Sequence, residues 1–237
     1  MAHNLPTFDP AQLLRVDVEA LFRSTPDGRL IESNEPPPAA APRVFVGRTA
    51  ASVEWRVRRD VPAEVAAEIG RVAADLPRLP ERTGDAALYA AIEAVAVRAA
   101  PIAERSLGPA YVFPQPAAPH PDVVEIREDG ELLAGPFAVL RRELEHVAPL
   151  FAIVRDGTVV SACFCARRTG AAAEAGVNTH HEHRGRGYAA AVVSAWRRAI
   201  ERSGRTPIYS TSYDNAASRG VARRLGLRQY AETLSLA

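Results

Sequence analysis

The segment "HHEHRGRGYAA" (residues 180–190) surrounds two glycines with histidines and arginines and then turns into small apolar residues. Before it, residues 172–179 alternate as in a strand, and after it residues 187–203 repeat apolar positions at helical spacing. A strand, a glycine-containing loop and a helix start suit an anion, because free N–H groups and the helix dipole favour negative charge. Arg184 and Arg186 add positive charge. The segment therefore predicts a phosphate-binding loop; the alternative is an ordinary glycine turn before a helix.

Regular elements are predicted on both sides of this loop. After it come a buried strand in "PIYSTS" (207–212), a helix over 215–225 that ends at Gly226, and a strand in "QYAETLSL" (229–236). Before it, the turn "RDGT" joins two strands as a hairpin. The elements expected ahead of the loop are strands at 123–127, 150–155 and 158–166 and a helix at 137–147. This order of elements is mixed α/β.

A proline cluster, "FPQPAAPHPD" (113–122), separates the two patterned parts of the chain and has no periodicity of its own. It predicts an N-terminal α+β domain over residues 1–118 and a second domain over 119–237. The elements expected in the first domain are helices at 10–22, 61–77 and 84–100 and paired strands at 43–49 and 52–60.

The residues of the loop and of the following helix resemble one known superfamily. Arg184, Gly187 and Ala189 have the spacing R-x-x-G-x-A, and "YSTSYDNAASRGVARRLGL" (209–227) carries an asparagine, a serine and a closing glycine in the expected order. In these features residues 119–237 resemble the GNAT superfamily of acyltransferases. The resemblance implies a mixed, mostly antiparallel central sheet flanked by helices, to which this chain adds the smaller N-terminal α+β domain.

The resemblance also implies acetyl-coenzyme A as the acyl donor. The loop amides would hold the pyrophosphate, and the end of the strand before the loop would hydrogen-bond the pantetheine arm. Asn215 would contact the arm or the product; the alternative is a plain N-cap with Ser218 in the first turn. The expected cofactor-binding residues are Val177, Asn178, Thr179, Arg184, Gly185, Arg186, Gly187, Tyr188, Ala189, Asn215 and Ser218.

The catalytic candidates come from the residue types that acyl transfer to an amine requires, a base and a proton donor. Many members of the superfamily place a carboxylate on the strand before the loop, where Glu174 is the only one here; a salt-bridged structural role is the alternative. The tyrosine that many members use as general acid is replaced by Ala222. Tyr213 or Tyr209 is then expected to protonate the thiolate, unless the thiolate leaves unassisted. His180 is a further candidate base.

The histidines and cysteines do not predict a metal site. His180, His181 and His183 lack the spacing of a recognised zinc motif, so polarity of the loop is the alternative role for them. Cys163 and Cys165 lie two apart on one predicted strand, which places both on one face, and we interpret them as small core residues of a protein in a reducing compartment. No metal is expected.

The overall charge is nearly balanced, at +1. From Arg184 to Arg228, however, ten arginines face only Glu201 and Asp214, a local charge of +8 that suits a phosphate-rich ligand. Three hypotheses follow: an acetyl-coenzyme A-dependent transferase acting on a small-molecule amine, a transferase whose donor is aminoacyl-tRNA, and a noncatalytic acyl-coenzyme A sensor.

The N-terminal part is expected to cover the acceptor side of the transferase, with Trp55, Tyr89 and Tyr111 as apolar walls or, alternatively, as core residues. The chain shows no membrane-spanning run and no signal peptide, so a cytoplasmic protein without a membrane partner is expected. Whether the protein forms a homodimer is not decided by the sequence.

Overall fold

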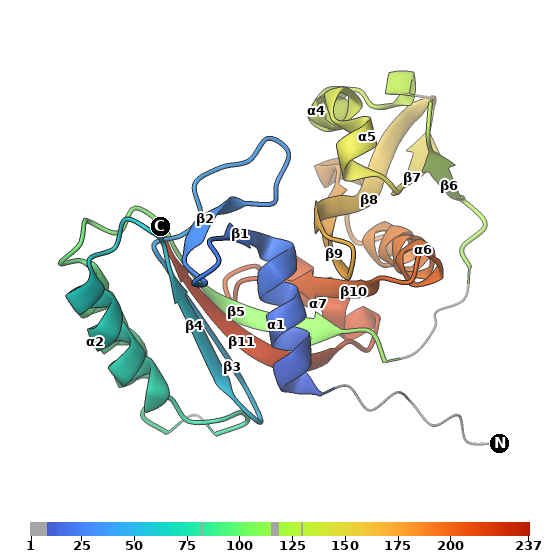
Figure 1. Ribbon diagram of the computed structural model, residues 1–237. Helices are drawn as coiled ribbons and strands as arrows, with labels where there is room; N and C mark the ends of the chain where they lie inside the picture. The colour runs from blue at the N-terminus through green and yellow to red at the C-terminus, as the bar shows by residue number, and fades with distance from the viewer. Residues whose placement is uncertain (1–8, 82, 115–118, 129) are drawn as a thin grey trace.

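A computed structural model of the chain describes residues 9–81, 83–114, 119–128 and 130–237. Its main feature is a nine-stranded sheet with helices on both faces (Figure 1). The strand order is β4-β3-β11-β5-β10-β9-β8-β7-β6, and every neighbouring pair is antiparallel except β9 and β10, which are parallel. The expected mixed, mostly antiparallel sheet flanked by helices is therefore confirmed.

The strands of the large sheet come from all parts of the chain. In sequence order they are β3 (Val44–Thr49), β4 (Val53–Val57), β5 (Arg105–Val112), β6 (Val123–Ile126), β7 (Leu150–Arg155), β8 (Thr158–Arg168), β9 (Ala172–Thr179), β10 (Thr206–Ser210) and β11 (Arg228–Leu236). A separate hairpin is formed by β1 (Phe22–Ser24) and β2 (Leu30–Ser33).

The helices bury apolar faces against both sides of the sheet. On one side lie α2 (Ala63–Ala74), α3 (Asp85–Ala96), α6 (Tyr188–Arg202) and α7 (Ala216–Arg224). On the other side lie α1 (Pro10–Leu21) and the short helices α4 (Ala138–Arg142) and α5 (Leu144–Val147). Figure 1 shows α1 lying across the middle of the sheet, over strands from both ends of the chain. Three short 3-10 turns, Gly130–Leu132, Gly135–Phe137 and His181–His183, complete the described elements.

The local signals in the sequence account for most of these elements. The hairpin turn between β7 and β8 has Asp156 at φ 50° and Gly157 at φ 73°, the left-handed conformations that a two-residue hairpin requires. Asn215 caps α7, because its side chain accepts a hydrogen bond from the N–H of Ser218 at 2.9 Å. Cys163 and Cys165 lie on one face of β8 in the core, as free thiols whose pKa values are raised by burial.

One expected element is wrong, and one strand of the large sheet was not expected. The helix expected over 137–147 is broken at Glu143, whose φ of −116° and ψ of 15° leave the helical region, so that α4 and α5 are separate. The segment that forms β5 was not expected to be a strand, yet it lies between β10 and β11 in the centre of the sheet.

The sheet runs without interruption past the expected boundary near residue 118. Strand β11 pairs with β3 on one edge and with β5 on the other, so strands from both sides of the boundary alternate. Residues 115–118 lie outside the described residues. The division into domains 1–118 and 119–237 stays a prediction.

The parallel pair β9 and β10 creates the opening on which the site depends. The recorded pairing runs from Thr206 opposite Ala172 to Ile208 opposite Glu174 and ends there. Beyond this point β10 turns to pair with β5, through Tyr209 and Ser210, while β9 continues to Thr179 along β8. The two strands therefore diverge and leave a gap in the hydrogen-bonded sheet.

Candidate functional site

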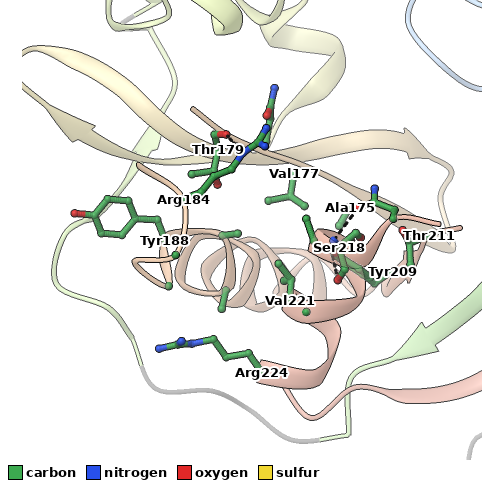
Figure 2. A pocket seen from close by; sticks show the side chains of 18 of the residues that line it. Ala175, Val177, Thr179, Arg184, Tyr188, Tyr209, Thr211, Ser218, Val221 and Arg224 are labelled. Atoms are coloured by element: carbon green, nitrogen blue, oxygen red, sulfur yellow. Dashed lines mark hydrogen bonds between the residues drawn. The ribbon is translucent and has the colours of Figure 1, made fainter. Parts of the chain in front are cut away.

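A cleft of about 790 Å³ occupies the place where β9 and β10 diverge. Its walls are the end of β9, the loop before α6, the start of α6, the end of β10 and one side of α7 (Figure 2). The lining residues are Ser106, Ala175, Val177, Asn178, Thr179, His183, Arg184, Gly185, Gly187, Tyr188, Ala189, Ala190, Tyr209, Ser210, Thr211, Ser212, Asn215, Ala217, Ser218, Gly220, Val221 and Arg224.

The loop before α6 and the first turn of α6 contribute several residues to the wall of the cleft. Gly185 and Gly187 have φ values of 77° and 83°, conformations that glycine adopts without strain. Gly187 is the N-cap of α6 and, like any glycine, offers no capping side chain. Across the described residues, no acceptor is bonded to the N–H groups from Gly185 to Ala190. These donors and the positive end of the helix dipole could bind an anion, and the phosphate-binding role of the loop stays a prediction.

Two arginines add positive charge beside this loop. The Nε atom of Arg184 donates to the carbonyl oxygen of Thr179 at 3.3 Å, which keeps the side chain next to the end of β9. Arg224, from the last turn of α7, extends beneath the start of α6 in Figure 2. Within the described ranges neither arginine forms an ion pair with a carboxylate. Their charge is available to a ligand in the cleft.

The opposite wall is held by a tyrosine and a serine. The hydroxyl groups of Tyr209 and Ser218 share a hydrogen bond of 2.8 Å, which fixes β10 against α7. Burial raises the pKa of Tyr209 to about 12, so the phenol keeps its proton at neutral pH. Ala222, at the place where a tyrosine was sought, is buried and carries no hydroxyl.

The structure brings together most of the expected cofactor-binding residues. Ten of them line the cleft: Val177, Asn178, Thr179, Arg184, Gly185, Gly187, Tyr188, Ala189, Asn215 and Ser218. Arg186 is exposed outside it, with Nη2 donating to the carbonyl oxygen of Glu182 at 3.4 Å. Ser210, Thr211 and Arg224 also line the cleft and were not expected. The sequence gives no signal for Arg224, and the only signal for Ser210 and Thr211 is their position at the end of a buried strand.

Glu174 lies on the side of the sheet away from α6. It is 4% exposed and does not line the cleft. One carboxylate oxygen accepts from Nη1 of Arg167, whose Nη2 contacts Glu35, and the other accepts from the hydroxyl of Ser210. The ion pair matches the structural alternative, while the bond to Ser210 connects the carboxylate to the cleft.

Tyr213 points away from the cleft, into a buried polar network. Its hydroxyl donates to Oε2 of Glu232, whose Oε1 accepts from Arg48 at 2.6 Å and from Tyr89 at 2.9 Å. Arg48 also contacts Asp85 at 2.6 Å. Burial alone would raise the pKa of Glu232, but these hydrogen bonds bring it below its ordinary value. The network ties the segment before α7 to the N-terminal half of the sheet.

The three histidines of the loop differ in their position relative to the cleft. His180 packs its ring 4.4 Å from that of His181 and does not line the cleft, whereas His183 does. Nδ1 of His180 is 3.7 Å from the carboxylate of Glu182. Among the described residues, no three or more histidine, cysteine, aspartate or glutamate side chains are grouped so that they could hold a metal ion.

Residues 150–234 match the model of the GNAT acetyltransferase family. The GNAT-like region begins at β7 and ends in β11, so it contains the loop before α6, α7 and all of the cleft lining except Ser106. The match supports acyl transfer as the general class of reaction. No curated protein matches the chain.

Several solved structures are similar to three quarters of the chain or more, at low identity. An acetyltransferase from the GNAT family of Colwellia psychrerythraea is 15% identical, with a TM-score of 0.48 over 77% of this chain and 75% of that one. A GCN5-related N-acetyltransferase from Kribbella flavida is 15% identical, with a TM-score of 0.47 over 97% and 95%. A GCN5-related N-acetyltransferase-like protein from Streptococcus suis is 15% identical, with a TM-score of 0.45 over 97% and 100%.

The cleft suits a coenzyme A thioester in shape and in charge. The unbonded amides of residues 185–190 and two unpaired arginines lie at one end, where a pyrophosphate requires donors. From there the cleft follows the unpaired edge of β9 to the point of divergence from β10, which offers backbone groups to an amide-containing arm. No helix among the described residues is long and apolar enough to cross a membrane.

Proposed function

We propose that the protein transfers an acetyl or other acyl group from a coenzyme A thioester to the amine of a small-molecule acceptor. The observation that carries this proposal is the run of unbonded N–H groups from Gly185 to Ala190 at one end of a cleft that continues to the gap between β9 and β10. A phosphate group at the loop and a thioester at the gap would occupy the two ends of this cleft.

The chain's own residues would bind and orient the donor. The amides of the loop, with Arg184 and Arg224, would hold the pyrophosphate. The edge of β9 from Val177 to Thr179 would accept and donate hydrogen bonds to the pantetheine arm. Binding along this length places the reacting carbonyl group at a defined point, which lowers the entropic part of the barrier.

Tyr209 is the hydroxyl group best placed to assist the departing sulfur. It lines the cleft, is 1% exposed and remains protonated at neutral pH. A hydrogen bond from its phenol to the sulfur would stabilise the charge that develops as the carbon–sulfur bond breaks. We assign this role to Tyr209 in place of Tyr213, whose hydroxyl is bonded to Glu232.

The N-terminal half would cover the side from which the amine approaches. Helix α1 contacts β9 and β11 on the face that carries Glu174, opposite the helices α6 and α7 that wall the cleft. In this arrangement the donor and the acceptor reach the gap from opposite faces of the sheet, and the N-terminal half decides which amines fit.

Calorimetric titration with acetyl-coenzyme A tests the donor. We expect binding by the parent protein and at least a tenfold loss of affinity in Gly187→Val, because a Cβ atom there lies 3.0 Å from Nη2 of Arg224 and crowds the loop amides. Gly204→Val is the matched control: Gly204 has φ 79°, close to the 83° of Gly187, and no atom within 4 Å of a built Cβ. It carries the same backbone strain away from the cleft.

Equal affinities in the parent and both variants would contradict the assignment of the phosphate loop. Absence of binding by the parent would contradict the assignment of acetyl-coenzyme A as the donor. Where binding is found, thiol release from acetyl-coenzyme A with a panel of primary amines identifies the acceptor, and no release with any amine would leave a binding protein in place of a transferase.

A further inference from the structure

One hydrogen bond connects the cleft to a carboxylate that the cleft does not contain. Ser210, the last residue of β10, lines the cleft, and its hydroxyl donates to Oε1 of Glu174. Glu174 is 4% exposed and sits on β9 where the recorded pairing with β10 ends. Ser210 is therefore the contact between the gap in the sheet and the buried acid.

Both oxygens of the Glu174 carboxylate accept hydrogen bonds from the protein. Its second oxygen accepts from Nη1 of Arg167, and Arg167 is itself held by Glu35. Because the carboxylate is buried and does not line the cleft, an amine at the gap between β9 and β10 reaches Glu174 through another group. Ser210 is that group, since its hydroxyl proton is committed to Glu174 and its oxygen lone pairs remain free to accept a proton.

Glu174 shares its buried surroundings with one arginine and a second carboxylate. Among the described residues Arg167, from β8, is the cation that pairs with Glu174, and Arg167 is shared with Glu35. From α1, Asp17 faces the same space and is fully buried, and from β11 Tyr230 donates to Asp17 at 2.6 Å. Burial and, next to it, the charge of Glu174 raise the pKa of Asp17 to about 7.

We propose that Ser210 carries the proton of the acceptor amine to Glu174. The inference rests on the proposed acyltransferase function. As the amine nitrogen forms its bond to the thioester carbon, its N–H proton passes to Oγ of Ser210 while the Ser210 hydroxyl proton passes to Oε1 of Glu174. The sulfur leaves with the electron pair of the carbon–sulfur bond and takes a proton from water, and Glu174 returns its proton to water through Ser210.

The test compares Ser210→Ala with Ser210→Thr, which keeps a hydroxyl group. Ser235→Ala is the control, because Ser235 is also a half-buried serine of a strand, in β11, and does not line the cleft. We expect all variants to bind coenzyme A within twofold of the parent. With an amine identified by thiol release, kcat should fall about 100- to 1,000-fold in Ser210→Ala and less than tenfold in Ser210→Thr.

Two further readouts separate a relay from a merely structural serine. The kcat of Ser210→Ala should rise steadily with pH into the alkaline range, because free hydroxide replaces the lost route, whereas the parent should reach a plateau. Ser210→Ala, Glu174→Gln and the double variant should all have the same kcat within threefold. Each single change already interrupts the proton route from the amine through Ser210 to Glu174, so the second change has nothing further to remove. Losses that multiply in the double variant would overturn the relay.

Infrared difference spectra check the hydrogen bond without turnover. The carboxylate band assigned to Glu174 by its loss in Glu174→Gln should change frequency in Ser210→Ala, because the hydroxyl group that donates to Oε1 has been removed. An unshifted band, or a Ser210→Ala kcat within threefold of the parent, would overturn the proposal. If the parent binds coenzyme A but releases no thiol with any amine, both the transferase function and the Ser210 relay are overturned. If the parent does not bind coenzyme A, the assignment of a coenzyme A thioester as the donor is overturned.

Discussion

The guanidinium group of Arg224 lies directly against the backbone of Gly187, so close that a Cβ atom at Gly187 would be 3.0 Å from its Nη2 and 3.2 Å from its Cζ. Gly187 begins α6 and Arg224 belongs to the last turn of α7. The two helices therefore meet at the loop whose amides are unbonded. A glycine here serves two purposes, because it permits the left-handed turn and leaves room for the arginine.

This contact predicts a role for Arg224 in binding the donor. Arg224→Ala should weaken coenzyme A binding about tenfold at low salt, because one charge-assisted contact to phosphate is lost. The difference from the parent should shrink as salt is raised. Calorimetry at two salt concentrations checks this, with Arg202→Ala, at the other end of α6, as the control. Equal affinities of Arg224→Ala and the parent would contradict it.

Removal of the Tyr209 hydroxyl should slow the reaction more than it weakens binding. In Tyr209→Phe the hydrogen bond to Ser218 and the proposed donor to the sulfur are both lost. We expect kcat to fall about 10- to 100-fold with coenzyme A affinity within threefold of the parent. Ser218→Ala separates the two effects, because it removes the bond but keeps the phenol. A kcat in Tyr209→Phe that equals that of Ser218→Ala would argue against the phenol.

The buried network around Arg48 should dominate the stability of the N-terminal half. Arg48 is fully buried and contacts both Glu232 and Asp85. Arg48→Met leaves Glu232 buried without its cation, so we expect a loss of about 3–5 kcal/mol in the free energy of unfolding. Urea denaturation measures it. Arg15→Met removes an exposed partner of Glu54 and should cost less than about 1 kcal/mol; equal losses in the two variants would contradict the prediction.

Asp17 should make the protein less stable as pH rises toward neutrality. Burial, with the charge of Glu174, raises its pKa from an ordinary 3.8 to about 7. Below pH 4 the group is protonated in both states, and between pH 4 and 7 the unfolded chain loses its proton first. Folding then becomes less favourable by as much as about 1.4 kcal/mol per pH unit, and the effect levels off above pH 7.

Asp17→Asn removes this dependence and can still accept the hydrogen bond from Tyr230. Its unfolding free energy relative to the parent should therefore rise by roughly 2–4 kcal/mol between pH 4 and pH 8. Denaturant titrations at several pH values measure the difference, with the exposed Asp75→Asn as control. A constant difference between Asp17→Asn and the parent over this range would contradict the raised pKa.

The strand, glycine-containing loop and helix around residues 172–202 were predictable because their physical requirements are local. A strand, two glycines and a helix start follow one another along the chain, and the structure places the strand at Ala172–Thr179 and the helix at Tyr188–Arg202. The N-cap role of Asn215 is equally local. Such features depend on residues a few positions apart, and the sequence contains all of them.

The central strand β5 was not predictable in the same way. Pro109 and Gly108 interrupt its pattern and are residues that strands usually avoid. The structure explains Gly108: a Cβ atom there would lie 2.0 Å from the carbonyl oxygen of Thr211, so only glycine lets the end of β10 pass this closely. Pro109 has no backbone N–H to donate, but its carbonyl oxygen still joins the strand to the chain after β10, because it accepts from the N–H of Thr211 at 3.2 Å.

The catalytic candidates show most clearly what could not be predicted from the sequence. Glu174 is on the expected strand, but which face of the strand it occupies, and that Ser210 bonds to it, follow from the packing of α1 and β10 against β9. Tyr213 is two residues from Asn215 and yet its hydroxyl is committed to Glu232. The direction of a side chain is decided by distant residues, and the sequence pattern does not contain it.

The position of β11 between β3 and β5 has a consequence for how the protein is made. Arg48 and Glu232, which meet across β3 and β11, are 184 residues apart in the sequence. During synthesis β3 and β5 leave the ribosome long before β11, and until it arrives each keeps an open edge that can pair with another chain. Closure of the sheet then requires a contact between segments far apart in the chain, which makes folding slow. Expression at low temperature or with a chaperone should therefore raise the soluble yield, and a fusion partner that interferes with residues 228–236 should lower it.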